Sequence, residues 1–473
     1  MEGIDYLMYK NTNTEKISVV LTVYNGELYL QECLESIMNQ TLSEIEIICV
    51  NDASKDKTLF ILEKYQKIDK RITIISNESN CGAGFSRNKG LDVAKGKYII
   101  FLDADDVFEK DMLEKAYVKA NEQEADICIF KENLFQNKED YISYFYPYKT
   151  ISKLNKMEYF SLKDINKKAF NLWNGWAWNK LFRKSFIEKT NVRFQEIQTT
   201  NDAYFVHVSM VNAKRIVFLD EILVHHRVGV KYSLSSSRDC SWECCCVYLK
   251  ELRNYLIIHN MYLEYERSFI NWTSNFLYWN YWTLNESNRK KLFYELKQHI
   301  LDEFEFYKYN QEYYYNDFYY WFVQTIYRSD KYSDCKILID ATKRWIFMLE
   351  NNDRKLEKLF EYLQKKQYHA AIWGAGERGK ALLDKCKNKS EIIKVYDKDS
   401  QKVGQKIKEG YMVEEFNDMT SQGIDFIIVT NTSYFDSIAK TVKKVAKNIK
   451  IFNLDYYQEC CLPSPVLLEE CML

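Results

Sequence analysis

The chain has 473 residues, of which 47% are hydrophobic and 28% are charged, and its formal net charge is −1. This composition is typical of a globular protein with two or three domains, and it excludes an intrinsically disordered chain. Because positive and negative charges nearly cancel, we expect no nucleic-acid partner.

The segment before Lys16 lacks the basic start and the apolar core of a signal peptide, and no apolar run reaches the ~18–20 residues that span a bilayer. The 13 cysteines are scattered, as is typical of reduced thiols. We therefore expect a cytoplasmic protein, with peripheral contact to the inner membrane and homo-oligomerisation left open. The cysteine cluster at 240–246 has no CxxC pair or nearby histidine, so we expect small buried side chains there and not a zinc site.

Strand and helix patterns alternate regularly from residue 16 to residue 130. The expected strands are 16–24, 44–52, 72–77, 97–103 and 125–130, and the expected helices are 26–40, 56–67, 83–94 and 110–122. Apolar, β-branched strands that alternate with helices predict an α/β fold with a doubly wound, largely parallel sheet.

The rest of the chain changes pattern twice. Residues 240–366 are helical and strongly aromatic, which predicts helix–helix core packing, with a dimer interface or a lipid-facing surface as the alternative. Strand–helix alternation then returns. We therefore predict three parts: an α/β domain over 1–239, a helical region over 240–366 and a small Rossmann-like domain over 367–473.

Polar side chains follow the predicted strands of the first domain at the point where each strand ends. They are Thr22, Tyr24, Asn25, Asp52, Asp103 and Asp105. Ligands of open parallel sheets bind beyond the carboxyl ends of the strands. Carboxylates this close need a counter-charge, and Mg²⁺ or Mn²⁺ supplies one while it shares its shell with substrate phosphates. The alternative for the acids after the fourth strand is an ordinary solvated turn.

The stretch ISVVLTVYNGELYLQECLESIMNQTLSEIEIICVNDASKDKT, followed by NCGAGFSRNKGLDVAKGKYIIFLDADD, resembles the nucleotide-binding half of bacterial family 2 glycosyltransferases. The similarity covers roughly residues 16–130 and continues more weakly through 176–187 and 201–205. It implies a GT-A fold, a UDP-sugar donor, a divalent metal and a hydroxyl acceptor. Thr22 stands where the family usually has proline. Ala53 stands where it usually has glycine, and this puts the local backbone in doubt if the position needs a positive φ.

The resemblance also implies roles for individual residues. Thr22, Tyr24 and Asn25 would line the nucleoside pocket, Asp52 would bind uracil or ribose, Arg87 would help to hold the donor, Asp103 would contact ribose and Asp105 would ligate the metal. Asp202 opens a predicted helix about a hundred residues further on, and it would be the base of a direct, inverting displacement. An N-cap role for Asn201 or Asp202 is the alternative.

Two further groups of residues are candidates for the same site. The resemblance implies that His226 completes the metal shell, as a downstream histidine does in some related enzymes, and Arg227 with Ser233 or Ser235 could hold the diphosphate. A structural role for His225 and His226 is the alternative. Trp173, Trp176 and Trp178 either stack on the acceptor sugar or belong to the core.

The C-terminal stretch IWGAGERGK places Gly374, Gly376 and Gly379 at GxGxxG spacing between a strand and a helix. Asp397 ends the next strand, where a ribose-binding acid sits in dinucleotide-binding folds. The stretch resembles small Rossmann-like modules appended to other carbohydrate enzymes. Nucleotide binding and a scaffolding or oligomerising role both stay open.

Together, these observations predict a metal-dependent inverting glycosyltransferase. It would transfer a sugar from a UDP-sugar to a glycan or lipid-linked glycan acceptor during synthesis of a bacterial surface polysaccharide, such as lipooligosaccharide or capsule. One alternative is a nicotinamide-dependent sugar oxidoreductase that acts through the C-terminal domain. The other is an inactive glycosyltransferase-like scaffold subunit, which the intact acids Asp52, Asp103, Asp105 and Asp202 argue against.

Overall fold

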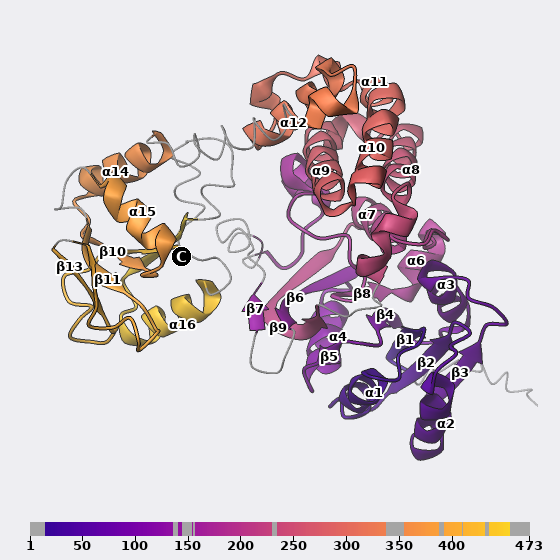
Figure 1. Cartoon of the computed structure of the whole chain (residues 1–473). Helices are drawn as coiled ribbons and strands as arrows, with labels where there is room; N and C mark the ends of the chain where they lie inside the picture. Colours follow the sequence, from indigo (N-terminus) through magenta and orange to yellow (C-terminus); the bar gives the residue numbers. More distant parts are fainter. Residues whose placement is uncertain are drawn as a thin grey trace, which may run out of the picture.

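The computed structural model describes residues 15–135, 141–143, 154, 157–228, 234–336, 354–386, 392–408, 410–430 and 435–454. The described chain forms two α/β units, each built around its own sheet (Figure 1). The α/β class predicted from the sequence is therefore confirmed.

The first sheet has nine strands in the order β3-β2-β1-β4-β8-β6-β9-β5, with β7 paired to β6. Their bounds are β1 Ile17–Val23, β2 Ile45–Asn51, β3 Ile72–Ser76, β4 Tyr98–Asp103, β5 Val107–Phe108, β6 Ile127–Phe135, β7 Tyr141–Ser143, β8 Lys180–Arg183 and β9 Ile216–Arg227. The side chains of β1, β2 and β4 are almost all buried, as expected for apolar strands covered on both faces.

The parallel arrangement expected for residues 16–130 is confirmed for β1 to β4, whereas the short strands β5 and β8, which the sequence did not predict, make the whole sheet mixed. Strands β3, β2, β1 and β4 are parallel, but β8 runs antiparallel to both β4 and β6, and β5 runs antiparallel to β9. Strand β8 is only four residues long. So short a strand has too few residues to show a clear alternation of apolar and polar side chains, so the sequence pattern does not predict it.

Helices cover this sheet and continue beyond it. They are α1 Leu30–Met38, α2 Thr58–Ile68, α3 Ala83–Val93, α4 Met112–Glu122, α6 Lys184–Thr190, α7 Asn201–Asn212, α8 Cys244–Ile258, α9 Tyr262–Thr283, α10 Glu286–Glu295, α11 Leu301–Glu303 and α12 Asp317–Arg328. Four short 3-10 segments and one π-helical turn lie among them: η1 Leu162–Lys168, η2 Leu234–Ser241, η3 Leu296–Ile300, η4 Phe306–Lys308 and η5 Gln311–Tyr313.

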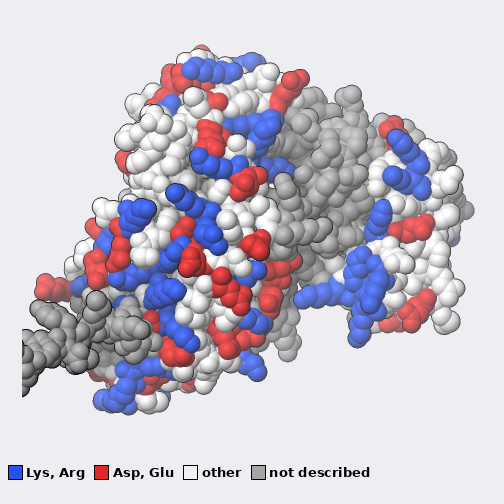
Figure 2. Space-filling view, turned by 180° about the vertical axis from the view of Figure 1, so that it is seen from behind, with Lys and Arg blue, Asp and Glu red and all other residues white. Residues whose placement is uncertain are grey.

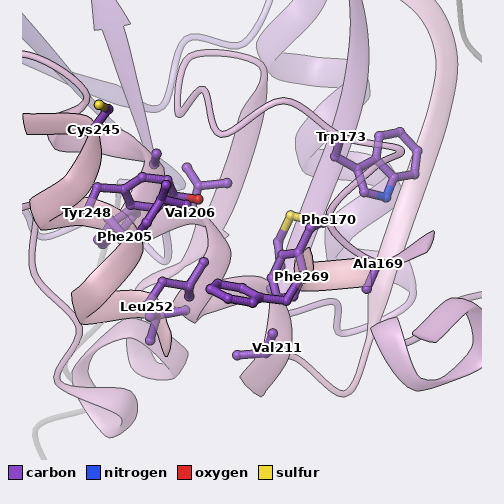
Figure 3. Packing of buried hydrophobic residues seen from close by; sticks show 14 of the residues in the cluster. Ala169, Phe170, Trp173, Phe205, Val206, Val211, Cys245, Tyr248, Leu252 and Phe269 are labelled. Carbon is purple, nitrogen blue, oxygen red and sulfur yellow. The ribbon is translucent and has the colours of Figure 1, made fainter. Parts of the chain in front are cut away.

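Helices α7, α8 and α9 pack on the sheet through one continuous apolar core. Phe205 of α7, Tyr248 of α8 and Phe269 of α9 are fully buried and belong to the same cluster as Phe101 of β4 (Figure 3). The core packing predicted for the aromatic middle is confirmed for Phe269. This core contains residues from both sides of the boundary expected at 239/240. The three-part division of the chain stays a prediction.

The second unit holds a six-stranded sheet in the order β12-β13-β11-β10-β14-β15, in which every pairing except β12–β13 is parallel. Its elements are β10 Ala370–Trp373, β11 Ile392–Tyr396, β12 Lys406–Lys408, β13 Tyr411–Glu414, β14 Phe426–Val429, β15 Lys450–Asn453, α14 Arg354–Lys366, α15 Glu377–Lys385 and α16 Phe435–Val445. Its central strand is the first in sequence, with later strands added on both sides. Doubly wound nucleotide-binding folds share this strand order.

The charged side chains of the described surface and the described cysteines do not indicate a further functional site. Lys and Arg side chains alternate with Asp and Glu side chains over the described surface in Figure 2, in keeping with the small net charge. Cys245 and Cys246 are buried as expected, but Cys240 is exposed, so that part of the prediction is wrong. Among the described residues, no helix is both long enough and apolar enough to cross a membrane.

Candidate active site

A cleft of about 660 Å³ lies at the carboxyl ends of β1 and β4. The first sheet, the helix α3, the loop at 174–178, helix α7, strand β9 and helix α9 all contribute to its walls. Its volume is in the range of small-molecule sites. Ten first-domain residues predicted for the site line it, namely Thr22, Tyr24, Asn25, Asp52, Arg87, Asp103, Asp105, Asp202, His226 and Arg227.

The sheet register brings the acidic turn and the end of β9 together. Asp103 lies opposite Thr22 at the end of the β1–β4 pair. Strand β5 then pairs with β9 so that Val107 lies opposite His225. The turn between β4 and β5, which carries Asp105 and Asp106, is therefore held beside His226 and Arg227.

Asp106 is the anchor of this turn. Its carboxylate is fully buried, and it accepts hydrogen bonds from Nδ1 of His226 and from the backbone N–H of Arg227, both at 2.9 Å. The sequence placed Asp106 in the acidic turn but gave no signal for this role, because its partners lie about 120 residues away.

Arg227 supports the turn from behind. Its Nε donates to the backbone oxygen of Asp105 at 2.9 Å, and its Nη2 donates to Glu32 at 2.8 Å. The guanidinium also lies 4.4 Å from each of the ring centroids of Tyr29 and Phe135. These contacts show that Arg227 positions the acids, and its predicted contact with the diphosphate stays a prediction. Ser233 and the side chain of Ser235, its suggested partners, lie outside the described residues.

Arg87 lies between the acidic turn and helix α7. Its Nη2 donates to Asp103 at 2.7 Å, and its Nη1 donates to the side-chain oxygen of Asn201 at 2.5 Å. The residue is only 4% exposed, so the ion pair with Asp103 is largely shielded from water. Arg87 therefore joins the acid that ends β4 to the first residue of the helix that carries Asp202.

Asp202 faces the cleft from the first turn of α7. Burial raises the pKa of its carboxyl, and Asp103 raises it further, while Arg87 opposes both effects. The helix begins at Asn201 after Thr200, a residue with φ of 61° and no side-chain capping bond. Because Asn201 binds Arg87 and Asp202 is inside the helix, the N-cap alternative is wrong.

The pKa values around the acidic turn reflect burial and the mutual repulsion of its carboxylates. Burial raises the pKa of Asp105 to about 7, and the neighbouring carboxylates of Asp106 and Asp103 add to the effect. Burial alone would lower the pKa of His226, but Asp106 and the other acids raise it to about 9. A site of this kind favours an added cation.

The residues present fit a divalent metal that also binds substrate. Within the described part of the chain, no three His, Cys, Asp or Glu side chains are grouped closely enough to hold a metal by themselves. Mg²⁺ and Mn²⁺ sites in phosphate-transfer enzymes commonly use one or two protein ligands plus phosphate oxygens. Nδ1 of His226 is hydrogen-bonded to the carboxylate of Asp106. The same arrangement orients the free Nε2 nitrogen of metal-ligating histidines towards the metal. His225 differs, since its two nitrogens contact Asn133 and Glu109.

The end of the cleft next to β2 is built around Asp52. This buried carboxylate accepts the backbone N–H groups of Cys81 and Gly82 at 2.9 and 2.8 Å and the side-chain amide of Asn77 at 2.7 Å. Asp52 thus fixes the loop that leads into α3, in addition to lining the cleft. Ala53 has a φ of 55°, so the position where the family usually has glycine does adopt the left-handed conformation.

The three tryptophans of the loop before β8 divide into two groups. Trp173 is buried in the apolar core and does not line the cleft. Trp176 and Trp178 do line it, and the ring of Trp178 stacks on His226 at 4.7 Å. Gly175 allows this loop to approach α7, because a Cβ there would lie 2.9 Å from the Cβ of Ala203.

Lys180 was not recognised from the sequence. Its buried Nζ donates to the backbone oxygens of Asn174 and Trp176 at 3.1 and 2.7 Å, and to the side chain of Asn179 at 2.7 Å. Burial lowers the pKa of Lys180 to about 8, although Glu132 and Asp202 oppose the shift. Lys180 therefore fixes the backbone of the loop at 174–178, which carries Trp176 and Trp178. The available signal was a lysine two residues after Trp178, next to the tryptophan-rich loop.

The glycine-rich loop of the second unit has the expected geometry, but Asp397 is already engaged. Gly374 has a φ of 123°, and a Cβ at Gly379 would lie 2.0 Å from the oxygen of Gly374. Asp397 accepts the N–H of Ala375 at 2.8 Å and that of Asp399 at 3.0 Å. Burial would raise the pKa of Asp397, but these hydrogen bonds lower it. Nucleotide binding by Gly374, Gly376, Gly379 and Asp397 stays a prediction.

This mixed sheet and the acidic turn that faces a helix-borne carboxylate define an α/β enzyme of the GT-A type. Residues 18–190 match the family described as glycosyl transferase family 2, and residues 366–452 match the family described as C2185-like, N-terminal. Glycosyltransferase GlyG of Streptococcus pneumoniae serotype 4 is 31% identical over 238 residues, which are 48% of this chain and 76% of that protein. The chain belongs to glycosyltransferase family 2 and is a glycosyltransferase.

Two other similar proteins cover less sequence or are more distant. The poly(ribitol-phosphate) beta-glucosyltransferase of Bacillus spizizenii is 41% identical over 119 residues, which are 24% of this chain and 19% of that protein. The crystal structure of S. aureus TarS 1-349 in complex with UDP-GlcNAc is similar with a TM-score of 0.44 and 21% identity, over 67% of this chain and 93% of that one.

Proposed function

We propose that this enzyme transfers a sugar from a UDP-sugar to a hydroxyl group of a bacterial glycan, with inversion at the anomeric carbon and with the help of Mg²⁺ or Mn²⁺. The observation that carries the proposal is the position of Asp202, which lines the same cleft as the acidic turn. The acceptor hydroxyl would lose its proton to Asp202 while its oxygen forms the new bond to the anomeric carbon. The bond from that carbon to the diphosphate breaks, and UDP leaves with the electron pair.

The residues of the acidic turn suit the departing diphosphate. Asp105 and Nε2 of His226 would hold the metal, and Asp106 and Arg227 keep these two groups in place. When bound, the metal supplies positive charge that stabilises the negative charge developing on the diphosphate. Thr22, Tyr24, Asn25 and Asp52 would receive the nucleoside, and Asp103 would contact the ribose. Their shared end of the cleft supports this assignment.

A polymeric bacterial acceptor is supported by the relatives. One of them is named for poly(ribitol-phosphate), although the match covers only 19% of that protein. We propose the same broad class of acceptor here, a surface polysaccharide or its lipid-linked precursor. Assembly at the cytoplasmic side of the membrane would follow from such an acceptor.

The proposal is tested with Asp202→Asn in the full-length protein. We expect UDP binding, measured by calorimetry, to stay within a factor of two, while UDP release from a panel of UDP-sugars with bacterial glycan extracts falls at least 10²-fold. Asp92→Asn is the matched control, because Asp92 is exposed and pairs with Arg193 outside the cleft. Near-normal turnover of Asp202→Asn would show that Asp202 is not the base.

The metal is tested separately through Asp105→Asn. We expect the dependence of UDP affinity on added Mn²⁺ to disappear in this variant while the thermal midpoint stays at or above that of the wild type, because one of several repelling carboxylates is removed. An unchanged response to Mn²⁺ would contradict the assignment of Asp105 as a ligand.

A further inference from the structure

Helix α9 contributes an aromatic strip to the cleft, far from the acidic turn in sequence. Trp272, Phe276 and Trp279 follow one another at spacings of four and three residues, so they lie on one face of the helix. Their rings are nearly parallel, with centroids 5.5 Å apart for the first pair and 6.1 Å apart for the second. All three side chains line the cleft that also contains Asp202. We call these three residues the α9 strip.

The opposite face of the same helix is the part that packs in the core. Its fully buried residues include Ile270, Thr273, Ser274 and Leu277. The α9 strip, in contrast, becomes more open along the helix, from half-buried Trp272 and Phe276 to Trp279, which is 45% exposed. Trp272 and Phe276 also pack against the core, whereas Trp279 does not belong to those contacts. Large aromatic side chains that line an open cleft are typical of a ligand surface.

The inner end of the strip is fixed by a buried hydrogen-bonded chain. Nε1 of Trp272 donates to the hydroxyl oxygen of Tyr248 at 2.9 Å, and that hydroxyl lies 2.6 Å from Nδ1 of His207. Burial lowers the pKa of His207 to about 3, so its ring is neutral and its Nδ1 accepts a hydrogen bond from the tyrosine hydroxyl. His207 belongs to α7, the helix that carries Asp202. The position of Trp272 is thereby fixed relative to the proposed base.

Polar groups accompany the rings along the strip. Asn275, on the same face of α9, lines the cleft with a side-chain amide. Arg238 lies at the outer end, with its guanidinium 3.6 Å from the ring centroid of Trp279. An amide and a guanidinium beside flat apolar faces are what a pyranose requires, because its C–H face is apolar and its hydroxyls need hydrogen-bond partners.

We infer that the α9 strip is the acceptor subsite, where a pyranose ring of the acceptor glycan stacks while its hydroxyl reaches Asp202. The inference rests on the proposed function, because it assigns the acceptor side of the same cleft. Asn275 and Arg238 bind the hydroxyls of this ring or of the next sugar towards the cleft mouth. An alkyl chain is a poorer occupant, since it offers no hydrogen bond to the amide of Asn275 or to the guanidinium of Arg238.

The test is saturation-transfer NMR on the full chain with UDP present. The probes are methyl glycosides of glucose, galactose, mannose and N-acetylglucosamine, and decyl phosphate is the alkyl probe. We expect at least one glycoside to receive saturation on its ring C–H protons. We expect its affinity to fall about two- to tenfold in Trp279→Ala, the range of one aromatic stacking contact. Trp282→Ala is the matched control, because Trp282 lies on the same helix but does not line the cleft.

The outcomes separate this inference from the proposed function. Calorimetry with UDP is run on every variant, and failure of the wild type to bind UDP would count against the donor assignment alone. The inference is overturned if no glycoside is saturated by the wild type, or if Trp279→Ala and Trp282→Ala weaken binding equally. It is also overturned if decyl phosphate is saturated in place of every glycoside, since the strip would then hold a lipid.

Discussion

The buried ion pair of Arg87 gives the sharpest test of how the site is held together. In Arg87→Met, a side chain of similar length fills the space but supplies no charge. Asp103 then loses the cation at 2.7 Å and stays close to Asp105 and Asp106, both of which have raised pKa values. Removing one partner of a buried pair costs about 3–5 kcal/mol.

The lower end of that range applies here. The side chain of Asp103 is 28% exposed, so water partly replaces the lost guanidinium. We therefore expect a loss of about 3 kcal/mol in the free energy of unfolding of the first unit, which corresponds to a fall of about 6 °C in its thermal midpoint. The matched control is Arg193→Met. Arg193 pairs with Asp92 at 2.6 Å, but the side chains are 41% and 58% exposed, so the expected loss is at most about 1 kcal/mol.

The assay is differential scanning calorimetry of the full-length chain, read at the transition of the first unit. A second comparison isolates the charge: Asp103→Asn in the Arg87→Met background removes the unpaired carboxylate and is expected to recover part of the lost midpoint. Equal shifts for Arg87→Met and Arg193→Met, or strictly additive effects in the double variant, would refute the reasoning.

Three further predictions concern the backbone, the loop packing and the base. Ala53→Gly relieves a left-handed alanine and is expected to stabilise the protein by about 0.5–1 kcal/mol, so a lower thermal midpoint would contradict the conformation at this residue. Gly175→Ala places a methyl group 2.9 Å from Ala203 and is expected to cost about 1–3 kcal/mol and to lower kcat; unchanged turnover and an unchanged midpoint would show that the approach to α7 is not tight. Because burial raises the pKa of Asp202 and only its ionised form accepts a proton, kcat/KM is expected to fall with decreasing pH through a pKa above the ordinary carboxyl value of 3.8, and an acid limb at or below 3.8 would contradict this environment.

The amino-acid sequence by itself determined the local elements and most of the donor side of the site. The apolar runs of β1, β2 and β4 and the helical periods between them fixed these elements to within a few residues. Parallel strands bring their carboxyl ends to one edge of the sheet. The sequence alone therefore predicts that Thr22, Asp52, Asp103 and Asp105 belong to one site. The side-chain period of a strand or helix is a local property, so the sequence pattern records it.

Contacts between distant segments were decided by the tertiary structure. The pairing of β5 with β9 brings Asp106 to His226 and Arg227, and the approach of α3 to α7 joins Arg87 to Asn201, 114 residues away. The aromatic residues of α9 have the same helical period whether they face a core or a cleft. Trp272 is hydrogen-bonded to Tyr248, which is hydrogen-bonded to His207. These contacts orient the face of α9 that carries Trp272 towards the cleft. Periodicity specifies which residues share a face, whereas the neighbouring elements decide what that face meets.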